Sequence, residues 1–370
     1  MQSKLFVRID RGSIARDDFA AMTSAHRITN VDVHEDCFQY GFDSITLDHA
    51  LLLLGQNKSR FGFDLWPYLH SAHGLFGRIA DGFVVMPSGS PDFKRRYSED
   101  LGVAIGSLFL AHTIGVRLET VAQIPTNARL EKHAKVPDFI GFDGANLKRV
   151  FECKGTTAPD DVDKYRQKAK SQLADHHEAN VTKFATVTYV PTSSKLIPPF
   201  IFVSDPPIPL PILSLPVATG LHFVLMLEYA GLEAAVEPLR GMLASWVKME
   251  QLSADGDRIS FELNADIEEQ KQRFRSVLTN AVERAGSMEV KGRRFVGITR
   301  SAENQGKKVK VFMGVDADHA ILLANTLAGS GSDAGGPLPQ YQADATVTGV
   351  QDGNFSLLSD GSLLHVYPFA

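Results

Sequence analysis

Cysteine is nearly absent from this sequence, and so is a signal for export. Only Cys37 and Cys153 occur in 370 residues, which argues against a disulfide framework and favours a reducing compartment. The opening Met-Gln-Ser-Lys does not have the charged-then-apolar order of a secretory signal. Both absences predict a cytoplasmic protein.

A long uninterrupted apolar run is also missing. The most apolar stretch, residues 196–232, is broken repeatedly by proline. Proline removes a backbone donor and clashes with the preceding helical turn, so a membrane-spanning helix cannot pass through this stretch. We therefore expect no membrane association.

The chain has no excess of positive charge. Its formal net charge is −5, so any contact with DNA or RNA has to depend on a local basic patch. Apolar residues make up 44% of the chain and charged residues 22%, which is ordinary for a folded protein and argues against extensive disorder. A length of 370 residues predicts two or three domains.

Three regions can be separated along the sequence. Residues 1–95 have no recognisable chemistry, whereas residues 96–215 show a regular succession of elements that opens with Ser98 as a helix cap. We expect strands over 117–124, 137–143 and 147–154, a helix over 161–177, and strands over 183–190 and 200–203. This order predicts an α/β fold with a central mixed sheet flanked by helices.

The third region, residues 216–370, is expected to be an α+β region that contacts nucleic acid or another copy of the chain. Its patterns predict helices over 221–246 and 267–285, strands over 295–298, 308–314 and 354–367, and a glycine-rich loop over 329–336. It also contains a basic cluster. This cluster could bind phosphate groups, although lysine is common at solvated strand edges too. The predicted phosphate contacts are Arg293, Arg294, Lys307 and Lys308.

The most informative segment is the hairpin formed by the strands over 137–143 and 147–154. If residues 144–146 form the turn, the numbers of paired residues sum to 290, and Asp138 lies opposite Glu152. Side chains alternate between the faces of a strand, so Asp138, Glu152 and Lys154 share one face. Asp143 has the opposite parity and is interpreted as a turn residue.

Two carboxylates that face each other within an apolar sheet are costly unless positive charge lies between them. A hard divalent cation with oxygen ligands removes this cost, which predicts Mg²⁺, with Mn²⁺ as a substitute. Lys154 adds a second positive charge. A metal-bound water and a lysine that stabilises developing negative charge are what the hydrolysis of a phosphodiester requires.

The combination of Pro137-Asp138 with Glu152-Cys153-Lys154 resembles the PD-(D/E)xK, or restriction-endonuclease-like, nuclease superfamily. The resemblance covers about residues 97 to 205 and includes the order of elements. It implies that Asp138 and Glu152 bind the metal with the Cys153 carbonyl, and that Lys154 serves catalysis. It further implies a glutamate from the preceding helix, for which Glu99 is the candidate. A polar residue on the following helix is also implied, with Lys168 and Gln172 as the candidates.

The resemblance implies a Mg²⁺-dependent deoxyribonuclease, with RNA as a less favoured substrate. Defence of a bacterium against foreign DNA is the expected setting, by analogy with the family. A repair or recombination nuclease is the enzymatic alternative. A module that binds nucleic acid or a partner without cutting is the alternative from another class. A homodimer is a mild expectation, because cutting both strands with a single-site domain often needs two copies.

Overall fold

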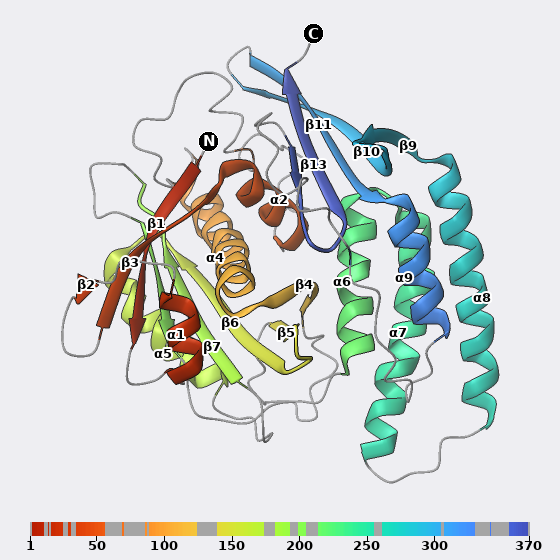
Figure 1. Ribbon diagram of the computed structural model, residues 1–370, viewed down its shortest axis with the longest axis horizontal. Helices are drawn as coiled ribbons and strands as arrows, with labels where there is room; N and C mark the ends of the chain where they lie inside the picture. The colour runs from red at the N-terminus through yellow and green to blue at the C-terminus, as the bar shows by residue number, and fades with distance from the viewer. Residues whose placement is uncertain are drawn as a thin grey trace. The chain divides into compact units, whose positions relative to one another are not determined.

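The computed structural model places the chain in two compact units, residues 1–211 and residues 212–370 (Figure 1). The structure describes residues 2–10, 14, 16–24, 29–30, 35–55, 69, 86, 89–123, 139–173, 182–192, 199–204, 214–254, 261–304, 307–329, 341 and 355–368. The predicted boundary at residues 215–216 lies close to the division between the units. Strands from residues 2–43 belong to the same sheet as those of the middle region, so both are parts of the first unit.

Within the described residues, the first unit has a mixed sheet of eight strands in the order β2-β3-β1-β8-β7-β6-β5-β4. These strands are β1 (Gln2–Asp10), β2 (Thr29–Asn30), β3 (Glu35–Asp43), β4 (Val116–Gln123), β5 (Phe139–Asp143), β6 (Lys148–Thr156), β7 (Thr182–Tyr189) and β8 (Phe200–Ser204). The pairs β1–β8 and β6–β7 are parallel, and the other neighbours are antiparallel. The predicted α/β fold with a mixed central sheet is confirmed.

Two helices cover opposite faces of this sheet at β6. The helices of the unit are α1 (Arg16–Thr23), α2 (Ser44–Leu54), α4 (Pro91–Ile114) and α5 (Val162–Leu173), the last preceded by a 3-10 turn, Pro159–Asp161. A Cβ atom at Gly106 of α4 would lie 2.7 Å from the Cys153 sulfur, so Cys153 points at α4. Val162 of α5 packs with Val187, the ladder partner of Lys154. Lys154 therefore belongs to the α5 face, as does Glu152.

The start of α4 corrects the prediction that Ser98 caps this helix. The cap is Ser90, whose hydroxyl accepts a hydrogen bond from the Phe93 amide at 3.2 Å, and Pro91 is the first helical residue. A serine followed by proline satisfies both preferences of a helix start, because proline has no amide to leave unpaired there. Ser98 lies inside the helix, where its hydroxyl donates to the Arg95 carbonyl at 2.7 Å.

The second unit consists of helices and an antiparallel sheet. Its elements are α6 (Leu215–Tyr229), α7 (Glu233–Ala254), α8 (Phe261–Arg284), β9 (Gly286–Val290), β10 (Arg293–Asn304), β11 (Lys307–Asp316), α9 (Ala317–Gly329), β12 (Phe355–Leu357) and β13 (Ser362–Pro368). The strand order is β12-β13-β11-β10-β9. No helix in the described part of the chain combines the length and apolarity that a membrane crossing requires.

The helix predicted over 221–246 is two helices, α6 and α7. The break lies at Gly231, whose φ of +69° is a left-handed conformation that ends a helix. The loop predicted over 329–336 lies, apart from Gly329 at the end of α9, outside the described residues. The predicted strands of this region correspond to β10, β11, β12 and β13.

His319 is a buried histidine of the second unit, next to the Tyr341 ring and near two carboxylates. Its Nε2 has no hydrogen-bond partner among the described residues. Burial lowers the pKa of His319, and this effect outweighs the opposite effect of Asp360 and Asp316. The folded protein therefore favours the neutral ring, whereas the unfolded chain binds a proton near pH 6.5.

The free energy of unfolding is consequently expected to fall as the pH drops below about 6.5, because the unfolded state then binds more protons. His319→Phe keeps an aromatic contact with Tyr341 but cannot titrate. We expect its stability to depend less on pH between 7 and 5 than that of the wild type. Denaturant unfolding at both pH values measures the effect, and an unchanged pH dependence would contradict it.

Candidate active site

The β5–β6 hairpin has the register that the sequence predicts. Phe139 pairs with Phe151, Ile140 with Val150, and the ladder ends at Phe142 and Lys148. In each pair the residue numbers sum to 290, so the predicted register is confirmed for the described part of the hairpin. Asp138 itself, with Pro137, lies outside the described residues.

Asp143 closes the turn of this hairpin, as predicted. Its Oδ1 accepts hydrogen bonds from the amides of Ala145 and Leu147, each at 2.9 Å. Asn146 between them has a φ of 59°, which asparagine tolerates better than most residues. The carboxylate therefore fixes the turn on which the register of the two strands depends.

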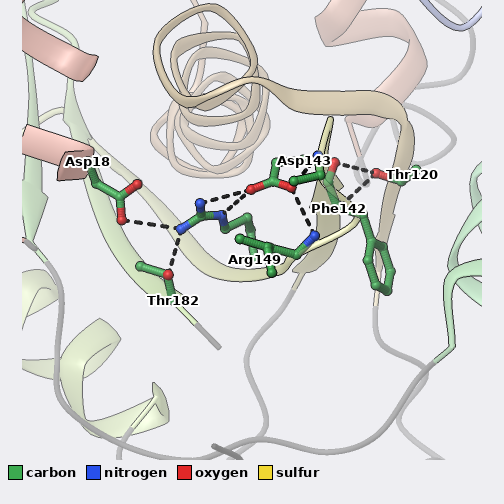
Figure 2. Close-up of polar contacts among 8 residues, drawn as sticks. Asp18, Thr120, Phe142, Asp143, Arg149 and Thr182 are labelled. Carbon is green, nitrogen blue, oxygen red and sulfur yellow. Dashed lines mark hydrogen bonds and ion pairs between the residues drawn. The ribbon is translucent and has the colours of Figure 1, made fainter. Parts of the chain in front are cut away.

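A buried arginine ties this turn to two other elements (Figure 2). The Arg149 guanidinium donates to Asp143 Oδ2 through Nε at 3.1 Å and Nη2 at 2.9 Å, and to Asp18 of α1 at 3.2 Å. It also donates to the Thr182 hydroxyl at the start of β7, at 2.5 Å. The network thus joins the hairpin, α1 and β7 around a single cation.

Arg149→Met is expected to lower the free energy of unfolding by about 3 kcal/mol, because it leaves the carboxylates of Asp143 and Asp18 with little solvent and no arginine. The matched control is Arg95→Met, which removes an exposed ion pair with Asp92 and should change the stability far less, because solvent screens exposed charges. Denaturant midpoints followed by circular dichroism compare the two variants. Equal shifts would show that the buried network adds no stability.

Glu152 and Lys154 are in direct contact on the α5 face of β6. The Lys154 ammonium forms an ion pair with Glu152 Oε1. The Glu152 side chain is 0% exposed, whereas 15% of the Lys154 side chain is exposed. A buried carboxylate is costly without a positive partner, so the lysine compensates a charge that the sheet would otherwise disfavour.

The backbone of β6 directs one carbonyl toward the β5 side of this site. The Asp143 amide donates to the Leu147 carbonyl at 3.1 Å, so residues of odd number on β6 turn their polar backbone groups toward β5. The Cys153 carbonyl follows this alternation, beyond the last described pair of the ladder. Its side chain points to the other face, where the Thr186 hydroxyl lies 3.2 Å from the sulfur.

The structure does not bring Glu99 together with Glu152. The Glu99 side chain is exposed on α4, where it acts electrostatically on Arg95. The helix α4 covers the Cys153 face of β6, and Glu152 points to the opposite face. The sequence prediction assumed a helix that begins at Ser98 and presents its first turn to the site. The observed helix begins earlier, and strand parity separates the two glutamates.

The helix after the motif, α5, lies on the same face as Glu152. Lys168 is exposed on this helix, and the side chain of Gln172 lies outside the described part of the structure. Two buried polar residues that the sequence argument missed also belong to this face, by their ladder positions: Lys183 of β7, 4% exposed, and Ser204 of β8, 0% exposed. The face on which they lie depends on pairing between distant strands, which no local sequence pattern indicates.

The predicted phosphate-binding residues of the second unit do not form one surface. Glu303 pairs with Lys308 and Asn304 with Lys307 along the β10–β11 ladder, so the two lysines lie on opposite faces of the sheet. The neighbours Arg293 and Arg294 alternate in the same way. These residues also have protein partners: Arg293 contacts Asp316 at 3.5 Å, Lys308 contacts Glu303 at 3.2 Å, and Arg294 donates to the Val282 carbonyl at 3.1 Å.

Comparisons with protein-family models, with curated proteins and with solved structures found no match for this chain. Among the described residues, no three histidine, cysteine, aspartate or glutamate side chains are grouped closely enough to hold a metal ion. The site that can be described therefore consists of Glu152, Lys154 and the backbone of Cys153.

Proposed function

We propose that this chain is a metal-dependent nuclease that hydrolyses phosphodiester bonds of DNA. The observation that carries the proposal is the ion pair of Glu152 and Lys154, with a fully buried carboxylate, in the middle of an apolar mixed sheet. Perturbed or costly charges of this kind are concentrated at functional sites. Their sequence context, Glu-Cys-Lys after Pro-Asp, is the pattern of the PD-(D/E)xK nucleases.

The arrangement of elements around the pair supports the same proposal. Helix α4, the antiparallel strands β4, β5 and β6, helix α5 and the parallel strand β7 follow one another in the chain, and the four strands are neighbours in the sheet. This is the order expected of a restriction-endonuclease-like core. The fold alone does not specify chemistry, so the argument for function depends on the charged residues that it positions.

The donor set suits a hard divalent cation. Glu152 offers a buried carboxylate, and the Cys153 carbonyl is directed to the β5 side of the same strand. Asp138 directly precedes β5 in the sequence and is the proposed third donor. Carboxylate and carbonyl oxygens are the ligands that Mg²⁺ prefers, and such an ion, when bound, supplies an activated water and polarises a phosphoryl oxygen.

The residues of the chain then have separate tasks. Glu152 holds the cation from a rigid position within the sheet. Lys154, which is partly exposed at the same face, stabilises the negative charge that develops on the phosphate. The α5 face excludes water around Glu152, because Val187, Phe202 and Tyr189 are buried there.

One observation favours a second candidate, a module that binds nucleic acid or a partner without cutting. The charges of Glu152 and Lys154 compensate each other without a metal ion. Glu99, the candidate ligand from the preceding helix, lies on the helix that covers the other face of the sheet. A purely structural ion pair would satisfy both charges in the same way. The two candidates differ in their dependence on metal.

The test is incubation of the purified full chain with supercoiled plasmid and with linear duplex DNA, in Mg²⁺ and in excess chelator. The nuclease proposal expects cleavage in Mg²⁺ that chelation abolishes. A single-stranded RNA substrate in parallel distinguishes DNA from RNA. Binding of DNA without cleavage in either Mg²⁺ or Mn²⁺ would favour the second candidate.

A further inference from the structure

In the proposed site, one oxygen atom of Glu152 would have to contact both the Lys154 ammonium and a divalent cation. Glu152 Oε1 contacts the Lys154 ammonium, and the whole Glu152 side chain is buried. A cation ligated by this carboxylate would lie within a few ångströms of the ammonium. Two positive charges at that separation in a poorly solvated site repel each other strongly. The lysine and a divalent cation therefore cannot both remain in contact with this oxygen.

We propose that Lys154 occupies the cation-binding oxygen of Glu152 in the metal-free protein and leaves it when a divalent cation binds. This inference rests on the proposed function insofar as Glu152 is taken as a cation ligand. Glu152 has little room to move, because its strand lies between β5 and β7 and its side chain is fully buried. Lys154 is the mobile partner, since its side chain is long and partly exposed.

The exchange has a consequence for catalysis. Residues two apart on a strand project from the same face, so Lys154 released from Glu152 still lies beside the site. The released ammonium is then available to a substrate phosphate. In the metal-free state the same ammonium is held by Glu152 and is less available. Lys154 thus couples cation binding to the readiness of the site for chemistry.

The experiment measures Mn²⁺ binding directly, by calorimetry and by the electron paramagnetic resonance signal of free Mn²⁺. Lys154→Met should bind Mn²⁺ about tenfold more tightly than the wild type, if the pairing with lysine leaves about a tenth of the wild-type molecules competent to bind. The matched control is Lys271→Met, which likewise removes a lysine from an ion pair, here with Glu268 in the second unit. Its Mn²⁺ affinity should equal that of the wild type.

Equal or weaker Mn²⁺ binding by Lys154→Met would overturn the exchange, provided that the variant is folded. If Lys154→Met does not fold, Lys154→Gln serves instead, because its amide can still donate to Glu152 without a charge; it should also bind Mn²⁺ more tightly. Loss of the tighter binding in Lys154→Met/Glu152→Gln would identify Glu152 as the ligand. Tighter binding that survives in this double variant would overturn the proposal.

The failure of this inference and the failure of the proposed function are distinguishable. If the wild type cleaves DNA in a metal-dependent manner but Lys154→Met binds Mn²⁺ like the wild type, the exchange is wrong and the nuclease assignment stands. If no variant and no condition gives cleavage, but Lys154→Met binds Mn²⁺ more tightly, the exchange stands and the nuclease assignment is wrong.

Discussion

Glu152→Gln is expected to abolish metal-dependent cleavage of DNA, with a loss of turnover on the order of 10³-fold or more. The amide has the size of the carboxylate but is neutral, so it is a poor ligand for a hard cation. The fold should persist, because the substitution removes a buried charge from the sheet. Lys154 loses the Glu152 carboxylate, but its partial exposure lets the ammonium reach water.

Single-turnover cleavage and thermal unfolding, measured on the same preparations, test this expectation. The matched control is Glu268→Gln, since Glu268 also pairs with a lysine but is exposed and belongs to the second unit. It should cleave DNA like the wild type. Substantial cleavage by Glu152→Gln at saturating Mg²⁺ would remove Glu152 from the site, and unfolding of the variant would show that the ion pair is needed for the structure.

Substitution of Asp138 tests the same proposed cation site. If Asp138 and Glu152 hold the same cation, Asp138→Asn should lose as much turnover as Glu152→Gln. The double variant should be no worse than either single variant, because residues that act as one unit do not have additive effects. Additive losses would mean that the two carboxylates act at different steps.

The hairpin was predictable from the sequence because its determinants are local. Asp143 and Asn146 specify the turn, and short runs of consecutive apolar residues, Phe139-Ile140 and Val150-Phe151, specify the strands. A short turn fixes the register, and the register fixes which side chains share a face. The shared face of Glu152 and Lys154 therefore follows from a few consecutive residues.

The position of Glu99 was not predictable in the same way. Ser98 followed by acidic residues is a good helix start, but Ser90-Pro91 is a better one, because proline at the first helical position has no amide to satisfy. Because the helix begins two turns earlier, Glu99 lies in its interior and not in its first turn. The face of the sheet that α4 covers is set by packing, with Gly106 against Cys153. The residues next to Glu99 in the sequence do not indicate which face this is.

The polar surroundings of the hairpin depend on contacts between distant residues. Arg149 meets Asp18 across 131 sequence positions and Thr182 across 33. Lys183 shares the face of Glu152 only because β7 runs parallel to β6 in a particular register. Such pairings are determined by the whole sheet, so local propensities and periodicity cannot specify them.

Lys154→Met should lower turnover by about 10²-fold to 10³-fold, while the affinity for DNA changes little. Lys154 lies beside Glu152, the proposed cation ligand. We therefore expect its charge to act mainly on the transition state and to add only one contact among many to DNA binding. Lys168→Met is the matched control, because Lys168 is exposed on the helix that covers the same face. Loss of this lysine should affect salt-dependent DNA binding, if anything, and leave turnover at saturating DNA intact.

Two measurements on both variants separate these roles: DNA affinity across a salt series in Ca²⁺, and single-turnover cleavage in Mg²⁺. A Lys154 variant that binds DNA normally and cuts slowly places the lysine in the chemical step. If the variant instead binds DNA weakly with an altered salt slope and cuts normally once saturated, Lys154 is a phosphate contact. The Mn²⁺ affinity of the same variant then decides whether the lysine also competes with the cation for Glu152. If the variant binds Mn²⁺ more tightly and cleaves DNA more slowly, the Lys154 ammonium has two roles: it pairs with the Glu152 carboxylate in the metal-free protein and stabilises the phosphate during the reaction.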